Sequence, residues 1–268
     1  AGQDADTARG LIANRIRGLL SAVPFDRLLP WLKAVADHVG LWPAAIRSVS
    51  DWLFFDRRRH PDAELAAKVR AFLDALMPAD LVDRALLFAA GWTSEIHDPD
   101  ADYDDKNSDI DLYYSDRMVV ALGEQIVGAG PDQLQRCLEA GVSRTLHSGF
   151  LLGSTLAKTL PDPKAAFRSL VGHADRRGSL ADDRFLRGFV SGLEARDASA
   201  ARASIDDALA SPVVGRCAAG LMQGLALGPA DMPRLVALLE DGQIRPDHCA
   251  YLSYGRGLDN VEPYALAP

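Results

Sequence analysis

The sequence predicts an all-α protein whose second half is an α-solenoid of HEAT-like helical hairpins. Helical periodicity extends along the whole chain, and no segment alternates apolar and polar residues over more than a few positions. Glycines occur in pairs four residues apart within apolar, helix-forming stretches, at Gly149 and Gly153, Gly188 and Gly192, and Gly220 and Gly224. The second glycine recurs after 39 residues (153 to 192) and after 32 (192 to 224), and Gly257 follows. A period of this length is typical of stacked helical repeats.

The glycine pairs predict close contacts between helices. A glycine in a helix interior costs about 1 kcal/mol relative to alanine, so packing must offset that loss. Residues i and i+4 share one helix face, and a pair of glycines there leaves a flat strip for a neighbouring helix. The glycines therefore indicate architecture and no particular reaction.

The first half of the chain divides into helices at its prolines. We expect helices near residues 8–20, 25–39, 43–55, 62–77 and 79–91, because Pro24, Pro43, Pro61 and Pro78 stand where helices begin or end. A polar segment follows from His97 to Ser108. A long helix is then predicted from Asp109 to Val127.

The second half reads as helices that pair into hairpins. They are expected near residues 132–140, 143–159, 163–173, 181–195, 198–210, 213–226, 230–241 and 247–257. We therefore expect an N-terminal helical segment (1–96), an acidic loop (97–108) and one continuous repeat array (109–268). Because the chain starts at Ala1 without Met, we expect it to be a piece of a longer protein.

Composition excludes several classes of function. The chain has 268 residues, 48% of them hydrophobic, and a net charge of −8, which disfavours nucleic acid as a partner. Cys137, Cys217 and Cys249 are far apart, so neither a disulfide framework nor a zinc site is predicted. No apolar run is long enough to cross a membrane. These features predict a cytoplasmic protein.

The acidic segment from Asp98 to Asp111 invites a metal interpretation. Asp100, Asp102 and Asp104 have the 1, 3, 5 spacing of a calcium loop, and Asp111 stands at its twelfth position. The sixth position, which needs glycine, is Asp105. A solvated loop without metal is therefore our prediction.

The same segment contains Ser108-Asp-Ile-Asp-Leu112, which looks like the Asp-x-Asp strand of nucleotidyltransferases. In that alternative Asp109 and Asp111 would hold magnesium against a triphosphate. Ser108 and Asp109 are also good N-caps for the predicted helix. Strands at residues 86–90 and 109–114 would favour the transferase, and helices there would exclude it.

Two charged surfaces are the candidate binding sites. No HExxH, Walker or catalytic-triad pattern is present, so no catalytic residue and no cofactor is predicted. The most charged segments expected to be exposed are a basic cluster and the aspartates. We predict that a partner protein is bound through Arg57, Arg58, Arg59, Asp98, Asp100, Asp102, Asp104 and Asp105.

Several runs between residues 60 and 262 follow one another in a characteristic order. They are Phe88-Ala-Ala-Gly-Trp92, an acidic Asp-Tyr loop, a long helix ending in Gly-Ala-Gly130, Arg187-Gly-Phe-Val-Ser-Gly-Leu193, Ile205-Asp-Asp-Ala-Leu-Ala-Ser-Pro-Val213 and Tyr251-Leu-Ser-Tyr-Gly-Arg-Gly257. This succession resembles the helical-repeat C-terminal arrays of large bacterial proteins, some of them similar to antiviral STAND-type ATPases. The resemblance implies a non-catalytic sensor or scaffold that binds a partner protein in antiphage defence. A structural spacer between domains remains a third alternative.

Overall fold

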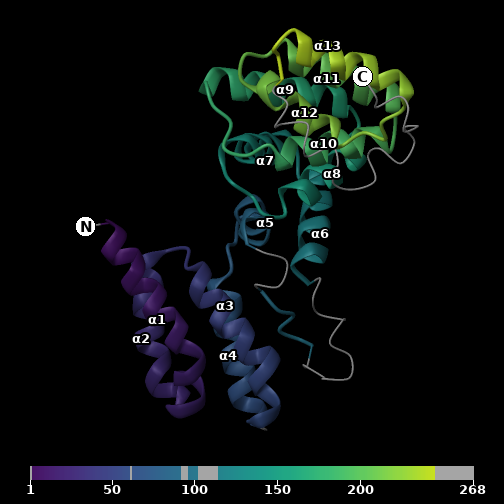
Figure 1. Cartoon of the computed structure of the whole chain (residues 1–268). Helices are drawn as coiled ribbons and strands as arrows, with labels where there is room; N and C mark the ends of the chain where they lie inside the picture. Colours follow the sequence, from purple (N-terminus) through teal and green to yellow (C-terminus); the bar gives the residue numbers. More distant parts are fainter. Residues whose placement is uncertain (1, 61, 92–95, 102–113, 245–268) are drawn as a thin grey trace. The chain divides into compact units, whose positions relative to one another are not determined.

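The protein is all-α over the residues that the structure describes. The computed structural model describes residues 2–60, 62–91, 96–101 and 114–244. Within these ranges it contains thirteen α-helices, short 3-10 and π turns, and no strand. The predicted all-α class is confirmed. The chain divides into two compact units, residues 1–118 and 119–268, and the division falls within α6 (Figure 1).

The first unit is built from five helices and the start of a sixth. The π turn is η1 and the 3-10 turn is η2. In chain order the elements are α1 (Gly2–Ala22), α2 (Phe25–Val39), α3 (Pro43–Asp51), η1 (Trp52–Asp56), η2 (Arg57–Arg59), α4 (Ala63–Leu76), α5 (Leu81–Ala90) and α6 (Tyr114–Gly128).

Local chemistry explains where these helices start and stop. Asp62 caps α4 by accepting from the main-chain N–H of Glu64 and of Leu65, and Asp80 caps α5 through the N–H of Asp83. Pro43 stands at the start of α3, where its missing N–H costs nothing. Each helix buries one apolar face, and Trp52 and Ile46 are fully buried in the core of this unit.

The second unit contains the helices that follow α6. Its elements are α7 (Pro131–Ser143), α8 (Gly149–Thr159), α9 (Pro163–Arg177), α10 (Arg184–Glu194), α11 (Ala198–Leu209), η4 (Val214–Cys217), α12 (Ala218–Met222), η5 (Pro229–Asp231) and α13 (Met232–Glu240). Helices α7, α9 and α11 contact one another in that order, whereas α8, α10 and α12 form a second series. Figure 1 shows the second series following one another across the unit.

The paired glycines lie at the contacts between α8, α10 and α12. A methyl group on Gly153 would overlap the main chain at Phe185, and one on Gly188 would overlap the carbonyl of Phe150. On the opposite face of α10, a methyl on Gly224 would come within 2.7 Å of the Arg187 carbonyl oxygen. Gly149 near the start of α8 lies by Arg184 and Phe185, whereas Gly192 near the end of α10 lies by Ser154 and Ala157, so these two helices run parallel. Gly220 lies by Asp183 and Gly224 by Ser191, so α12 runs in the same direction. The prediction that the pairs mark close helix contacts is confirmed.

Helix α10 is buried on two sides because it lies between α8 and α12. Its buried residues include four large apolar side chains and both of its glycines. Arg196, two residues beyond the end of α10, donates from Nη1 to the carbonyl oxygens of Ala157 (3.0 Å) and Leu160 (2.5 Å). The cation thus binds at the negative C-terminal end of α8, which joins consecutive members of the series.

Several predicted helix boundaries are wrong. The helix expected over 143–159 begins at Gly149, and the helix expected over 43–55 ends in the π turn η1. The helix expected over 213–226 is the 3-10 turn η4 followed by the five residues of α12. Three glycines within ten residues, Gly215, Gly220 and Gly224, weaken it. Residues 109–113 and 247–257 lie outside the described ranges.

No helix among the described residues is long and apolar enough to span a bilayer.

Candidate functional site

A buried carboxylate lies in the π turn η1 of the first unit, at Asp56. A π turn adds one residue to a helical turn, and such turns are frequent at functional sites. Here Trp52, Leu53, Phe54 and Asp56 are all buried. The wider turn therefore directs a carboxylate, together with three apolar side chains, toward the interior.

Arg17 of α1 compensates the buried carboxylate of Asp56. Its Nε lies 2.5 Å from Oδ2 of Asp56 and its Nη2 lies 3.1 Å from Oδ1, which is bidentate geometry. The guanidinium carbon also lies 5.0 Å from the centre of the Phe55 ring. The hydrogen bond to Asp56 raises the pKa of Arg17, so this cation stays charged.

His97 lies against the same turn. Its ring stacks on Phe54, with the centroids 4.8 Å apart and the planes 5° apart. Its main-chain N–H donates to Oγ of Ser50 at 2.7 Å, and Nε2 lies 3.5 Å from Oδ1 of Asp51. Burial raises the pKa of Asp51, although the charge of His97 opposes that shift. His97 therefore fixes the start of the acidic segment to α3 and η1.

Three arginines hold the described part of the acidic segment, and we call them the arginine cradle: Arg57, Arg70 and Arg117. Arg57 donates to three consecutive carbonyl oxygens, at 3.0 Å to Pro99, 3.4 Å to Asp100 and 3.2 Å to Ala101. Arg70 of α4 pairs with the Asp100 carboxylate, and Arg117 of α6 lies 3.5 Å from Oδ2 of Asp98. The cradle thus contacts both the main chain and the carboxylates of residues 98–101.

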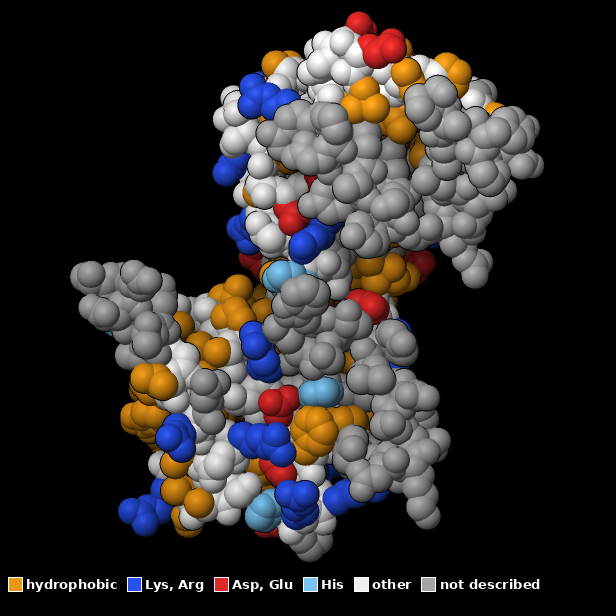
Figure 2. All heavy atoms as spheres, viewed as in Figure 1, with side chains coloured by type: hydrophobic (Ala, Val, Ile, Leu, Met, Phe, Trp, Pro, Cys, Tyr) orange, Lys and Arg blue, Asp and Glu red, His pale blue; other side chains and the backbone are white. Residues whose placement is uncertain are grey.

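The electrostatics of Asp100 reflect this contact. The hydrogen bond from Arg70, reinforced by the charge of Arg57, lowers the pKa of Asp100 despite partial burial. Figure 2 shows basic, acidic and histidine side chains alternating over α3 and α4 on this face of the unit. The carboxylates of Asp98 and Asp100 therefore have cationic partners within the same chain.

The structure brings together some of the predicted binding residues. Arg57, Asp98 and Asp100 belong to one network, and Arg58 and Arg59 lie beside it on η2, both exposed. Asp102, Asp104 and Asp105 lie outside the described residues. So do Asp109 and Asp111, the ligands of the transferase alternative.

Sequence reasoning missed the partners of these residues. Arg70 lies 30 positions before Asp100, and Arg117 lies 19 positions after Asp98. Both stand in ordinary helical patterns that carry no local signal. Arg17 and Asp56, 39 positions apart, were missed for the same reason.

The described residues offer no metal centre and no reactive thiol. No group of three His, Cys, Asp or Glu side chains within the described ranges has the geometry to hold a metal ion. Asp100, which has the first position of the calcium-loop spacing, is paired with Arg70. Burial raises the pKa of the Cys137 thiol to about 12, which leaves it unreactive at neutral pH.

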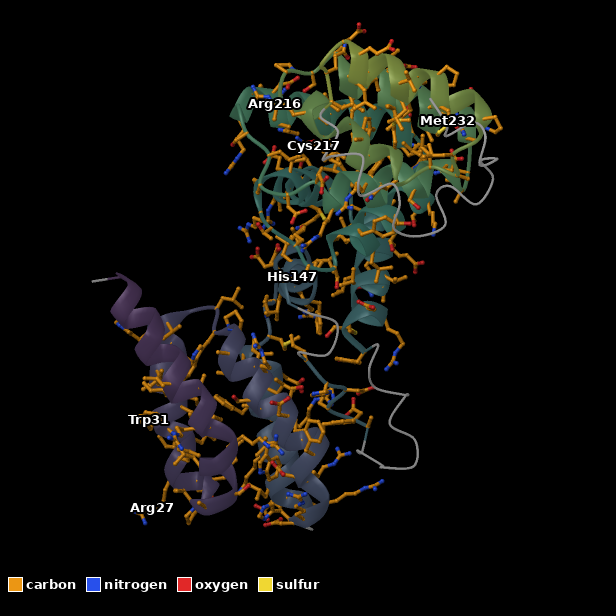
Figure 3. All side chains as sticks on the ribbon, in the orientation of Figure 1. Arg27, Trp31, His147, Arg216, Cys217 and Met232 are labelled. Atoms are coloured by element: carbon orange, nitrogen blue, oxygen red, sulfur yellow. The ribbon has the colours of Figure 1, made fainter. Side chains whose placement is uncertain are left out.

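Two cavities among the described residues are further candidate sites. One, of about 440 Å³, lies in the first unit between the α1–α2 turn and the start of α4, and its charged lining residues are Asp26, Asp62, Glu64 and Lys68. The other, of about 350 Å³, lies in the second unit and is lined by Asp182, Asp183, Arg184, Arg187 and Gly220. In the same unit, Nη1 of Arg184 lies 3.2 Å from Nδ1 of His147. Figure 3 labels His147, and also Arg216 and Cys217 of this unit.

The second cavity lies at the N-terminal end of α10. Asp183 precedes the first residue of this helix but makes no capping hydrogen bond, and its carboxylate lies 3.2 Å from Nε of Arg187. The missing side chain of Gly220 leaves room for that carboxylate, since a methyl there would come within 2.5 Å of Oδ2 of Asp183. Burial raises the pKa of Asp183 even though Arg187 acts in the opposite direction.

Comparison with protein-family models, with curated proteins and with solved structures finds no match for this chain. The geometry of the chain itself is therefore the basis for any function assigned to it.

Proposed function

We propose that this chain is a non-catalytic helical-repeat scaffold, an α-solenoid of the HEAT-like kind, that binds a partner protein. The observation that carries the proposal is the parallel stacking of α8, α10 and α12 through their glycine pairs. Equivalent helices that stack in parallel at a spacing of about 35 residues are what repeated helical hairpins produce. Such arrays use their long exposed surfaces to recognise other proteins.

The charge and the resemblance to bacterial repeat arrays give the proposal its biological setting. A net charge of −8 disfavours nucleic acid and leaves proteins as the natural partners. The setting we propose is the bacterial cytoplasm, in antiphage defence, with an ATPase or effector carried by another part of a longer protein.

The transferase alternative receives no support from the first of its two strands. Residues 86–90 belong to helix α5, whereas that alternative requires a strand there. No observation favours the spacer alternative over partner binding.

Recovery of partners from cells challenged with phage tests the proposal. The bait proteins are the wild-type chain and two charge-reversed variants, Arg57→Glu/Arg58→Glu/Arg59→Glu and Asp98→Lys/Asp100→Lys. We expect at least one variant to lose a partner that the wild type recovers, while circular dichroism shows both to be folded. Turnover of a nucleotide by the purified chain, with no protein partner found, would contradict the proposal.

A further inference from the structure

We propose that the arginine cradle is a recognition site for an acidic peptide of a partner protein that adopts a turn, and that residues 98–101 occupy it as an internal substitute. This inference rests on the proposed function of the chain as a protein-binding scaffold and names the chemistry of one contact. The acidic occupant already present in the cradle defines what fits it.

The cradle contacts main-chain atoms. Arg57 directs its guanidinium at the carbonyl oxygens of three consecutive residues, at 3.0 to 3.4 Å. Every peptide carries such oxygens, so these bonds select a backbone conformation and not a particular side chain. Here that conformation is a turn, in which the N–H of Ala101 donates to the carbonyl oxygen of Asp98 at 3.2 Å. An incoming peptide can form the same bonds once residues 98–101 leave.

The cradle also contacts two carboxylates at a fixed spacing. Arg117 faces Asp98 and Arg70 faces Asp100, with buried Pro99 between them. Asp98 also accepts the N–H of Asp100 through Oδ1 at 3.0 Å, which sets the local turn. The preferred ligand is therefore a peptide in which two acidic residues flank one small or apolar residue.

A free peptide can replace the charged contacts of residues 98–101, because these contacts are exposed to solvent. The side chain of Asp100 is 74% exposed and that of Arg117 is 51% exposed. Ion pairs with partners this exposed contribute little to stability, and salt screens them further. The segment keeps its place mainly because it is tethered, which gives it a high effective concentration at the cradle.

Competition between a tethered and a free occupant has a measurable consequence. The apparent dissociation constant of a free peptide equals the intrinsic constant divided by the fraction of molecules whose cradle is open. Weakening the internal segment must then tighten the binding of a free peptide. If residues 98–101 serve only to fix the loop, the same change creates no binding at all.

The probe is a fluorescein-labelled peptide with the sequence of residues 96–103, Ile-His-Asp-Pro-Asp-Ala-Asp-Tyr, titrated in fluorescence anisotropy at low salt. We expect the Asp98→Asn/Asp100→Asn variant to bind it at least tenfold more tightly than the wild type does. Asparagine keeps the Oδ1 acceptor that the turn needs while removing the charge. Adding Arg57→Gln/Arg70→Gln to that variant should abolish binding.

Two controls separate the cradle from general charge. Arg168→Gln/Arg234→Gln removes the same number of arginines from ion pairs of the second unit and should leave binding unchanged. A peptide with asparagine in place of each aspartate should bind at least tenfold more weakly than the acidic probe. Equal binding of the two peptides, or no binding by the folded Asp98→Asn/Asp100→Asn variant, would overturn the inference.

These outcomes are distinct from failure of the proposed function. Peptide binding by the purified chain without a cellular partner would contradict the scaffold proposal and leave the cradle in place as an acidic-peptide site. A partner that both the wild type and Arg57→Gln/Arg70→Gln recover, with no peptide binding, would leave the scaffold in place and exclude the cradle as its contact.

Discussion

The α-carbon of Gly188 in α10 lies directly against the main-chain carbonyl of Phe150 in α8. The reverse contact is made by Gly153, one turn after Phe150 in α8, whose α-carbon lies against the carbonyl of Phe185, one turn before Gly188 in α10. Each helix thus presents a glycine to the main chain of its neighbour. Because main-chain atoms cannot rotate away as a side chain can, this contact accepts no other residue without separating the helices.

Replacing Gly188 with alanine should destabilise the second unit. The added methyl group would overlap the Phe150 carbonyl, and over-packing of this kind typically costs about 1 to 3 kcal/mol. The gain in helix propensity from glycine to alanine, about 1 kcal/mol, is too small to reverse that loss. Chemical denaturation of the variant and the wild type measures the difference.

A matched control for this variant lies in α9 of the same unit. A methyl group on Gly172 would meet only Nη1 of Arg176, at 3.4 Å, which is an ordinary contact. Gly172→Ala should therefore raise stability by about 0.5 to 1 kcal/mol through helix propensity. If the two variants shifted stability in the same direction, the glycine pairs would have no special packing role.

The glycine contacts could be predicted from the sequence because they repeat. A residue type that is costly in a helix, and that returns at the same face every 32 to 39 positions, implies a recurring neighbour. The boundaries of α8 and α12 could not be predicted, because tertiary contacts decide where a glycine-rich segment leaves the helical conformation. Gly215, for example, would place a methyl 3.1 Å from the Leu209 carbonyl, a contact that only the folded chain creates.

The candidate site was predictable only where its charges cluster along the chain. Arg57, Asp98 and Asp100 stand in conspicuous charged runs, whereas Arg70 and Arg117 stand on amphipathic helices outside any such run. Nothing in a helical pattern shows which of its exposed cations will meet a carboxylate 30 positions away. The π turn that buries Asp56 has no sequence signature that we can identify.

Loss of the Arg17 side chain should destabilise the first unit more than loss of an exposed cation does. Arg17→Met leaves the carboxylate of Asp56, which is 7% exposed, without its bidentate partner. Hydrogen bonds to charged groups contribute about 1.5 to 3 kcal/mol, and we expect a loss in that range.

Lys68→Met is the matched control for this variant. Lys68 bridges Asp26 and Glu64, whose side chains are both at least 75% exposed. Solvent and salt screen exposed pairs of this kind, so we expect a smaller loss of stability than for Arg17→Met. Equal losses for the two variants in urea denaturation would show that burial of Asp56 adds nothing.

The stability of the second unit should depend on pH through Asp183. Burial raises the folded-state pKa of this carboxyl above its unfolded value, so the folded protein holds the proton more tightly. Ionisation of Asp183 therefore lowers the free energy of unfolding at pH values above the folded-state pKa. This loss disappears as the pH falls below the pKa of Asp183 in the unfolded chain. Asp183→Asn should raise Tm at pH 7 and leave it unchanged near pH 3.

The groups that face Asp183 define the control for that experiment. They are Arg187 and Arg184, the neighbouring Asp182, and the thiol of Cys217. Asp197→Asn, at the N-cap of α11, changes charge equally but keeps the acceptor for the Ala200 N–H, and asparagine caps as well as aspartate. A rise in Tm at pH 7 for Asp197→Asn as large as for Asp183→Asn would refute a specific role for the buried carboxyl.

Divalent cations should leave the melting temperature of the chain unchanged. The carboxylates of Asp98 and Asp100 already have cationic partners in Arg117 and Arg70, and the hydrogen bond from Arg70 lowers the pKa of Asp100. A metal ion would have to displace both arginines, whereas a tight site would add about 2.7 kcal/mol at a hundredfold excess of ligand over Kd. Thermal melts at millimolar calcium or magnesium, with and without EDTA, measure this directly. The Arg70→Gln variant sharpens the test because it frees the Asp100 carboxylate. We expect no rise in Tm with calcium or magnesium. An EDTA-reversible rise in Tm for the wild type would restore the calcium-loop interpretation.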